Sequence, residues 1–124
     1  MTDSTAILLV EDNAMNRDML VRRLRRAGFS VITAENGQQA LDKMRKSMPA
    51  IVLMDMNLPV VDGWTASKRA RKDDSIAHIP IIALTAHAMD SDKANALRAG
   101  CDDYATKPID FPDLLEKIRK LSTP

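Results

Sequence analysis

Five short runs of apolar residues alternate along the chain with longer segments in which apolar residues recur every three or four positions. The short runs are rich in Ile, Leu, Val and Ala, which is typical of strands covered on both faces of a sheet. The longer segments have amphipathic helical spacing and are bounded by capping residues and glycines. The predicted strands are Ala6–Val10, Phe29–Ala34, Ile51–Met54, Ile79–Leu84 and Cys101–Ala105, and a helix is predicted after each of them.

Repeated strand–helix units of this length predict an α/β fold with a doubly wound parallel sheet. We expect a flavodoxin-like (βα)5 arrangement with strand order 2-1-3-4-5, in which the first and third strands are neighbours. No repeat, linker or low-complexity tract interrupts the pattern, so residues 1–124 are expected to form one domain.

Composition narrows the class of protein. The chain has 18 Lys and Arg against 17 Asp and Glu, a net charge of +1, so no partner such as nucleic acid or an anionic membrane is expected. A single cysteine, Cys101, excludes an internal disulfide framework. The N-terminus lacks the features of a signal peptide, and no apolar stretch is long enough to span a bilayer. We therefore expect a cytoplasmic protein.

Four of the five predicted strands end in residues that carry chemistry. Glu11 and Asp12 follow the first strand, Asp55 the third, Thr85 the fourth and Lys107 the fifth. Taken alone, Asp55 is equally well interpreted as a helix cap. The carboxyl ends of parallel strands meet at one edge of the sheet, so these side chains are predicted to share that edge.

Three carboxylates in one cleft repel each other unless a cation is present. Few, hard oxygen ligands favour Mg²⁺ over Ca²⁺. Neither histidine falls in the acid cluster, and a lone cysteine cannot build a zinc site. Asp55, between the metal and Lys107, is suited to attack phosphorus, and Thr85 can donate its hydroxyl to the same phosphoryl group.

With these motifs the sequence resembles the receiver domains of two-component response regulators over nearly its whole length. It is similar to the receivers of hybrid kinases and to the stand-alone receivers of phosphorelays and cell-cycle control, more than to chemotaxis-type motor binders. The motifs that carry the resemblance are Val10-Glu11-Asp12-Asn13, Met54-Asp55-Met56-Asn57-Leu58-Pro59, Asp62-Gly63, Ala83-Leu84-Thr85-Ala86 and Thr106-Lys107-Pro108.

The resemblance implies a role for each site residue. Asp55 would be the phosphorylation site, and Lys107 would pair with the phosphoryl group. Asp12 and Asp55 would bind Mg²⁺ through their carboxylates, Asn57 through its backbone carbonyl, and Glu11 through water.

The resemblance also implies a switch and partners. Thr85 and Tyr104 would be the switch pair, and the bond between Lys107 and Pro108 would be cis. The phosphodonor would be a histidine kinase or a histidine phosphotransfer protein. Output to a downstream protein target would pass through the face made by the fourth helix, the fifth strand and the fifth helix. Such a domain catalyses only its own phosphorylation and slow autodephosphorylation, so it is not an enzyme in the ordinary sense.

Two alternatives use a similar fold. A Mg²⁺-dependent aspartyl-phosphate phosphatase of the haloacid-dehalogenase kind needs Asp-x-Asp after the first strand, where this chain has Glu11-Asp12. A flavin-binding module needs a phosphate loop at that point, which these acids would repel. His87, two residues past Thr85, is expected near the pocket mouth, where it would affect water access.

Overall fold

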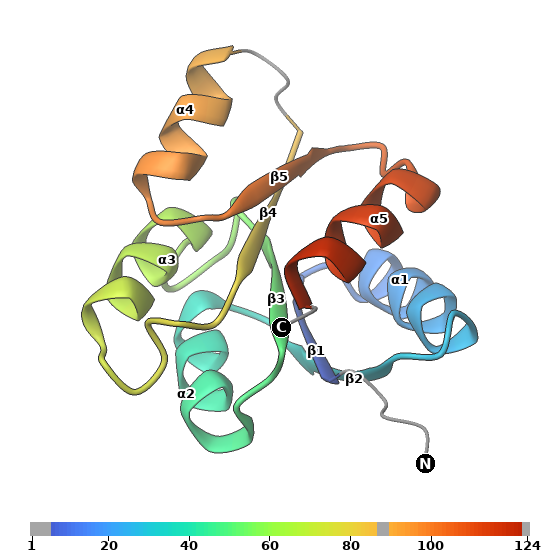
Figure 1. Cartoon of the computed structure of the whole chain (residues 1–124), viewed down its shortest axis with the longest axis horizontal. Coiled ribbons are helices and arrows are strands. Elements are labelled where there is room, and N and C mark those ends of the chain that lie inside the picture. Colours follow the sequence, from blue (N-terminus) through green and yellow to red (C-terminus); the bar gives the residue numbers. More distant parts are fainter. Residues whose placement is uncertain (1–5, 87–89, 123–124) are drawn as a thin grey trace.

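Five parallel strands form one sheet in the order β2-β1-β3-β4-β5, as predicted (Figure 1). The computed structural model describes residues 6–86 and 90–122, with the backbone alone for residues 90–93. The strands are β1 (Ala6–Val10), β2 (Ser30–Ala34), β3 (Ile51–Asp55), β4 (Ile81–Thr85) and β5 (Asp103–Thr106). The helices are α1 (Ala14–Arg26), α2 (Gly37–Ser47), α3 (Gly63–Lys72), α4 (Asp90–Arg98) and α5 (Phe111–Ser122).

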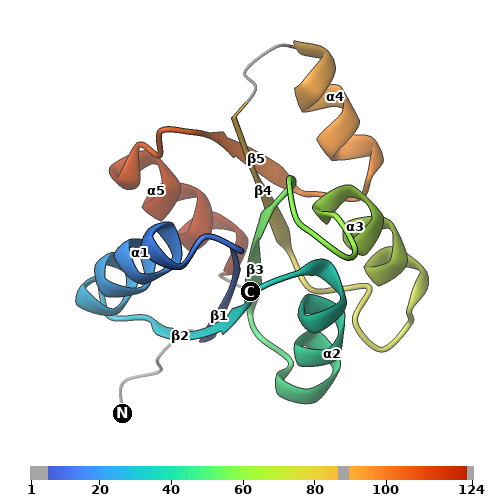
Figure 2. The same cartoon turned by 180° about the vertical axis from the view of Figure 1, so that it is seen from behind.

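Helices cover both faces of the sheet. Helices α1 and α5 lie on one face, and α2, α3 and α4 lie on the other (Figures 1 and 2). Side chains of a strand alternate between faces, so neighbouring residues enter different cores. Ile7 and Leu9 pack with Leu24 of α1 and Ile118 of α5. Their neighbours Leu8 and Val10 belong to the second core, with Met44 of α2, Ala66 of α3 and Ala96 of α4.

The strand register decides which residues meet at the carboxyl edge. Val10 of β1 pairs with Met54 of β3, so the next residues, Glu11 and Asp55, leave the ladder side by side. On the other side of β3, Asp55 pairs with Leu84 of β4. The central strand β3 thus delivers its terminal carboxylate between the ends of β1 and β4.

Several details differ from the predictions. Strand β5 begins at Asp103 rather than at Cys101, because Asp102 turns its side chain to the backbone amide of Ile81. The pair Asn36-Gly37 is a turn signal in the sequence, but in the structure Asn36 is the N-cap of α2, with its side chain accepting from the Gln39 amide. Helical spacing places Met15 on one apolar face with Leu20 and Leu24, but in the structure Met15 is 76% exposed. None of the helices in the described part of the chain has the length and apolar character needed to cross a membrane.

Candidate functional site

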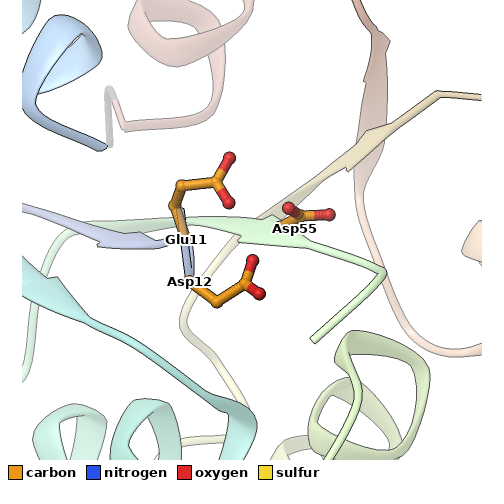
Figure 3. Close-up of side chains that lie close together, drawn as sticks. All are labelled: Glu11, Asp12 and Asp55. Atoms are coloured by element: carbon orange, nitrogen blue, oxygen red, sulfur yellow. The ribbon is translucent and has the colours of Figure 1, made fainter. Parts of the chain in front are cut away.

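Three carboxylates meet where β1 and β3 end. Oxygen atoms of Glu11, Asp12 and Asp55 lie within 4.8 Å of one another (Figure 3). Glu11 is 1% exposed and Asp55 5%, whereas Asp12 is exposed to solvent. Two buried carboxylates at this distance repel each other unless a cation or a proton offsets their charge.

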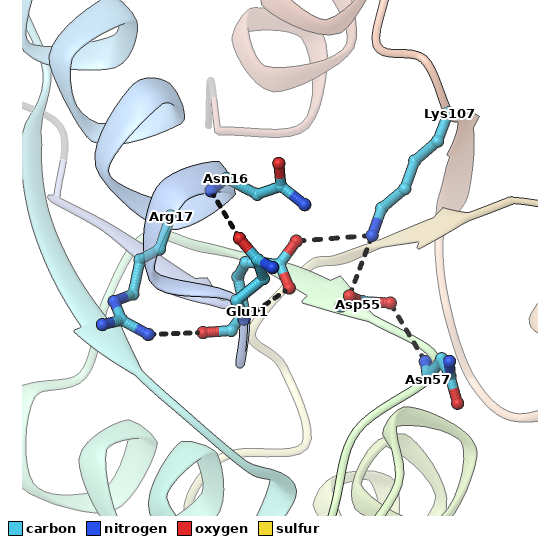
Figure 4. Close-up of polar contacts among 7 residues, drawn as sticks. Glu11, Asn16, Arg17, Asp55, Asn57 and Lys107 are labelled. Atoms are coloured by element: carbon cyan, nitrogen blue, oxygen red, sulfur yellow. Dashed lines mark hydrogen bonds and ion pairs between the residues drawn. The ribbon is translucent and has the colours of Figure 1, made fainter.

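Lys107 supplies part of that compensation from the far side of the sheet edge. Its Nζ donates to Asp55 Oδ2 at 2.9 Å and to Glu11 Oε1 at 3.3 Å (Figure 4). The other oxygen of Asp55, Oδ1, accepts from the backbone amide of Asn57 at 3.0 Å. Both carboxylate oxygens of Asp55 are therefore held, Oδ2 by the ammonium of Lys107 and Oδ1 by the backbone amide of Asn57. The peptide bond between Lys107 and Pro108 is cis, as the resemblance implied.

Burial and charge perturb the proton affinity of this cluster. Burial raises the pKa of the Glu11 carboxyl; a hydrogen bond from the Asn13 amide opposes the shift, and nearby Asp55 adds to it. Burial disfavours the ammonium of Lys107, but its contacts with Asp55 and Glu11 outweigh that effect and raise the pKa of Lys107 above its ordinary value. Lys107 is thus held as a cation.

The acids open onto a cavity of about 490 Å³. Thr85 at the end of β4 lines this cavity, together with Asn57 and Trp64 of the β3–α3 region. The cavity therefore has room for a tetrahedral anion, and Lys107 and Thr85 both line it. Of the predicted site residues, Glu11, Asp12, Asp55, Asn57, Thr85 and Lys107 all border the cavity.

Tyr104 is not among the side chains that border the cavity in the described part of the chain. It lies on β5, where its backbone pairs with Ala83, and its half-buried ring packs against the core. Lys117 of α5 places its Nζ 5.0 Å from the centre of that ring and donates to the Tyr104 carbonyl at 2.6 Å. Tyr104 thus links β5 to α5. His87 lies outside the described residues.

The donor set suits a hard divalent cation. The cluster offers carboxylate oxygens alone, without imidazole or thiolate, and the adjoining cavity leaves space for water ligands. Mg²⁺ keeps several waters and binds through one or a few carboxylates, so the residues present fit this metal class.

Two residues of this site, Arg17 and Trp64, were not predicted from the sequence. Arg17 of α1 donates to the backbone carbonyl of Glu11 at 3.0 Å (Figure 4). Trp64 lines the acid cavity although it belongs to α3. The one signal for Arg17 was a basic residue in the first turns of a helix, where the positive end of the helix dipole disfavours it.

Comparison with known proteins identifies the family. The model of the response regulator receiver domain matches residues 7–119. The chain belongs to this family. It is 38% identical over 114 residues to the polar-differentiation response regulator DivK of Brucella anthropi, covering 92% of this chain and 93% of that protein. It is also 41% identical over 120 residues to hybrid signal transduction histidine kinase M of Dictyostelium discoideum, covering 93% of this chain but 5% of that protein.

Solved receiver structures have the same fold. The receiver domain of a sensor histidine kinase from Pseudomonas aeruginosa, solved with a magnesium ion in its active-site cleft, superposes with a TM-score of 0.89 at 36% identity, covering 97% of this chain and 98% of that one. The receiver domain of Ssk1 from Saccharomyces cerevisiae, solved with the phosphotransfer protein Ypd1, gives a TM-score of 0.88 at 36% identity, covering 96% and 89% of the two chains.

The chain is therefore a response-regulator receiver domain of two-component or phosphorelay signalling. Nothing in the comparisons supports the alternative of a haloacid-dehalogenase phosphatase.

Proposed function

We propose that Asp55 accepts a phosphoryl group from a phosphohistidine of a histidine kinase or a histidine phosphotransfer protein. The observation that carries this proposal is the hold on the Asp55 carboxylate at the end of β3. Lys107 binds one of its oxygens and the Asn57 amide binds the other, beside an open cavity. A carboxylate fixed in this way is oriented for attack at low entropic cost.

In the reaction, a carboxylate oxygen of Asp55 attacks phosphorus and forms a new O–P bond. The phosphohistidine ring is protonated on its other nitrogen, so when the P–N bond breaks and its electron pair stays on the ring, the donor leaves as neutral imidazole. Lys107 remains beside the transferred group and offsets the charge on its oxygens. Thr85 faces the same cavity and donates its hydroxyl to the bound phosphoryl group.

Glu11, Asp12, Asp55 and the backbone carbonyl of Asn57 are the groups that would hold Mg²⁺. When bound, Mg²⁺ supplies charge stabilisation to the oxygens of the transferring phosphoryl group. The mutual repulsion of the three carboxylates supports this assignment, because Lys107 contacts only two of them.

Output is proposed to pass through the α4–β5–α5 face to a downstream protein. Thr85 and Thr106 are partners in the register of β4 and β5, so a movement of Thr85 acts directly on β5, which also carries Tyr104. Tyr104 is tied to α5 through Lys117. The domain acts by accepting one phosphoryl group and signalling its presence, not by turning over a substrate.

The test is phosphorylation by acetyl phosphate followed by intact-mass measurement. Wild-type protein with Mg²⁺ should gain one phosphoryl group, while Asp55→Asn and wild type in EDTA should gain none. Asp74→Asn removes an exposed acid far along the chain and is the matched control, so it should react like wild type. Labelling of Asp55→Asn at the wild-type rate would show that another residue is the acceptor.

A further inference from the structure

The backbone amide, the backbone carbonyl and the carboxylate of Glu11 each have a hydrogen-bond partner. Its backbone amide donates to the carbonyl of Ala34 at the end of β2 at 3.0 Å. Its carboxylate accepts from the Asn13 amide at 3.2 Å and from Lys107 at 3.3 Å. The remaining group is its backbone carbonyl, which lies beyond the last residue of β1 and so has no partner in the sheet.

Arg17 satisfies that carbonyl. Its Nη1 donates to the Glu11 oxygen at 3.0 Å, and its side chain is 16% exposed. The carbonyl belongs to the peptide unit between Glu11 and Asp12. Peptide units are planar, so one hydrogen bond to this oxygen fixes the orientation of the whole unit. The directions in which both neighbouring carboxylates project depend on that orientation.

We propose that Arg17 is a positioning residue that sets the Glu11–Asp12 carboxylate pair for the divalent cation. This inference rests on the proposed function, because it concerns the same acid site. Arg17 is not among the described residues that line the acid cavity. It acts through the peptide that carries two of the three acids.

The placement of Arg17 in its helix supports a role beyond helix stability. It lies in the first turns of α1, where the helix dipole disfavours a cation. An arginine at this position does not stabilise the helix, so its hydrogen bond to the Glu11 carbonyl explains its presence better. It also adds a positive charge behind the acid cluster, where it offsets part of the repulsion among the carboxylates.

The ion pair of Arg17 with Glu35 is the weaker of its two contacts. Nη2 of Arg17 is 3.5 Å from Glu35 Oε1, and the Glu35 side chain is 59% exposed. Exposed pairs at this distance contribute little. Glu35 therefore offers a control that removes the ion pair and leaves the carbonyl hydrogen bond in place.

The test measures affinity for a divalent cation directly, with Mn²⁺ as the probe and its electron paramagnetic resonance signal as the readout. Arg17→Met keeps the unbranched stem of the side chain and removes every donor. It should raise the Mn²⁺ dissociation constant by about tenfold, the lower end of the losses seen when partners of metal ligands are removed. Arg17→Lys restores one cationic donor and should stay within about threefold of wild type, and Glu35→Gln within about twofold.

A second measurement separates positioning from loss of fold. If Arg17 acts through the metal site, the slow phosphorylation of Arg17→Met by acetyl phosphate should recover at saturating Mg²⁺, and its metal-free circular dichroism should match wild type. If Arg17→Met does not fold, Arg17→Leu, which also lacks a donor, replaces it and should weaken Mn²⁺ binding in the same direction.

Three results would overturn the inference: wild-type Mn²⁺ affinity in the folded donor-free variant, an Arg17→Lys variant as weak as Arg17→Met, or an equal loss in Glu35→Gln. Failure of the proposed function looks different. In that case wild type itself would bind no Mn²⁺ or would not be phosphorylated on Asp55.

Discussion

Arg71 Nη2 lies 2.7 Å from Asp102 Oδ2, and the same carboxylate oxygen accepts a hydrogen bond from the backbone amide of Ile81 at 2.9 Å. The other donors of Arg71 reach the backbone carbonyls of Ala77, Ile79 and Gly100. One guanidinium therefore joins the end of α3, the start of β4 and the turn between α4 and β5. These contacts fix the edge of the sheet opposite the acid site.

Loss of this guanidinium should destabilise the domain. Arg71→Ala leaves several carbonyls and a carboxylate without their donor, and should lower the free energy of unfolding by about 2–3 kcal/mol. Arg69→Ala removes an exposed arginine of the same helix and should change it by less than about 0.5 kcal/mol. Urea unfolding of the two variants provides the comparison. Equal stability of both would mean that the contacts of Arg71 are not energetically important.

Gly100, in the turn between α4 and β5, and Gly28, in the turn between α1 and β2, form a matched pair of variants. Both have positive φ, +98° and +101°, so a side chain at either is strained. A Cβ at Gly28 meets nothing within 4 Å, whereas one at Gly100 would lie 2.4 Å from Arg71 Cγ. Gly28→Ala should lower the free energy of unfolding by about 1–2 kcal/mol through backbone strain alone. Gly100→Ala should lower the free energy of unfolding by clearly more in the same urea unfolding experiment, and a smaller loss would contradict the close approach of Arg71.

Asp73 gives a prediction in acid. Hydrogen bonds from Ser75 and the contact with Arg45 lower the pKa of its carboxyl from 3.8 to about 2. Because the folded-state pKa is depressed, the stabilisation is present above pH 3.8 and is lost as the pH falls through about 2. The difference in stability between wild type and Asp73→Asn should therefore shrink across that window. This difference in stability should be small, because solvent screens the contacts of Asp73. A difference that stays constant across the pH window would show that the ionisation of Asp73 is not its source.

Divalent cations should stabilise the folded protein. A ligand that binds only the native state raises the melting temperature by mass action. Calorimetry in EDTA and in millimolar Mg²⁺ should show a rise for wild type and a smaller rise for Asp12→Ala. Without metal, Asp12→Ala should be at least as stable as wild type, because one of three repelling carboxylates is gone. An unchanged wild-type melting temperature would count against the metal site.

Thr85→Ala should separate phosphorylation from output. Asp55 keeps its contacts with Lys107 and Asn57, so it should still accept a phosphoryl group. Phosphorylation shifts a conformational equilibrium only through contacts that differ between the two states, and the Thr85 hydroxyl is proposed to supply one. Beryllofluoride, a phosphoryl mimic, should change partner affinity at least about fivefold in wild type and much less in the variant.

The control for this variant is Thr33→Ala, in the edge strand β2. It should respond to beryllofluoride like wild type. If Thr85→Ala also responds fully, the hydroxyl of Thr85 is not the coupling group.

The sequence by itself determined the strand–helix alternation, the strand order and the identity of the acid cluster. Local patterns suffice for these features, because a buried parallel strand must be continuously apolar and must end where polar groups appear. Asp55 follows Ile51–Met54 directly, and the rules of parallel sheets bring it to the edge that also carries Glu11 and Asp12.

Only the tertiary structure decided how those residues are held. Lys107 reaches Glu11 across 96 positions of sequence, and Arg17 turns back to a backbone carbonyl that no sequence pattern marks. The same is true of Asp102, whose side chain binds Arg71 and the Ile81 amide and so delays the start of β5. Hydrogen bonds of this kind depend on the positions of backbone groups in space. Periodicity records which face of an element is buried, but it carries no information about those positions.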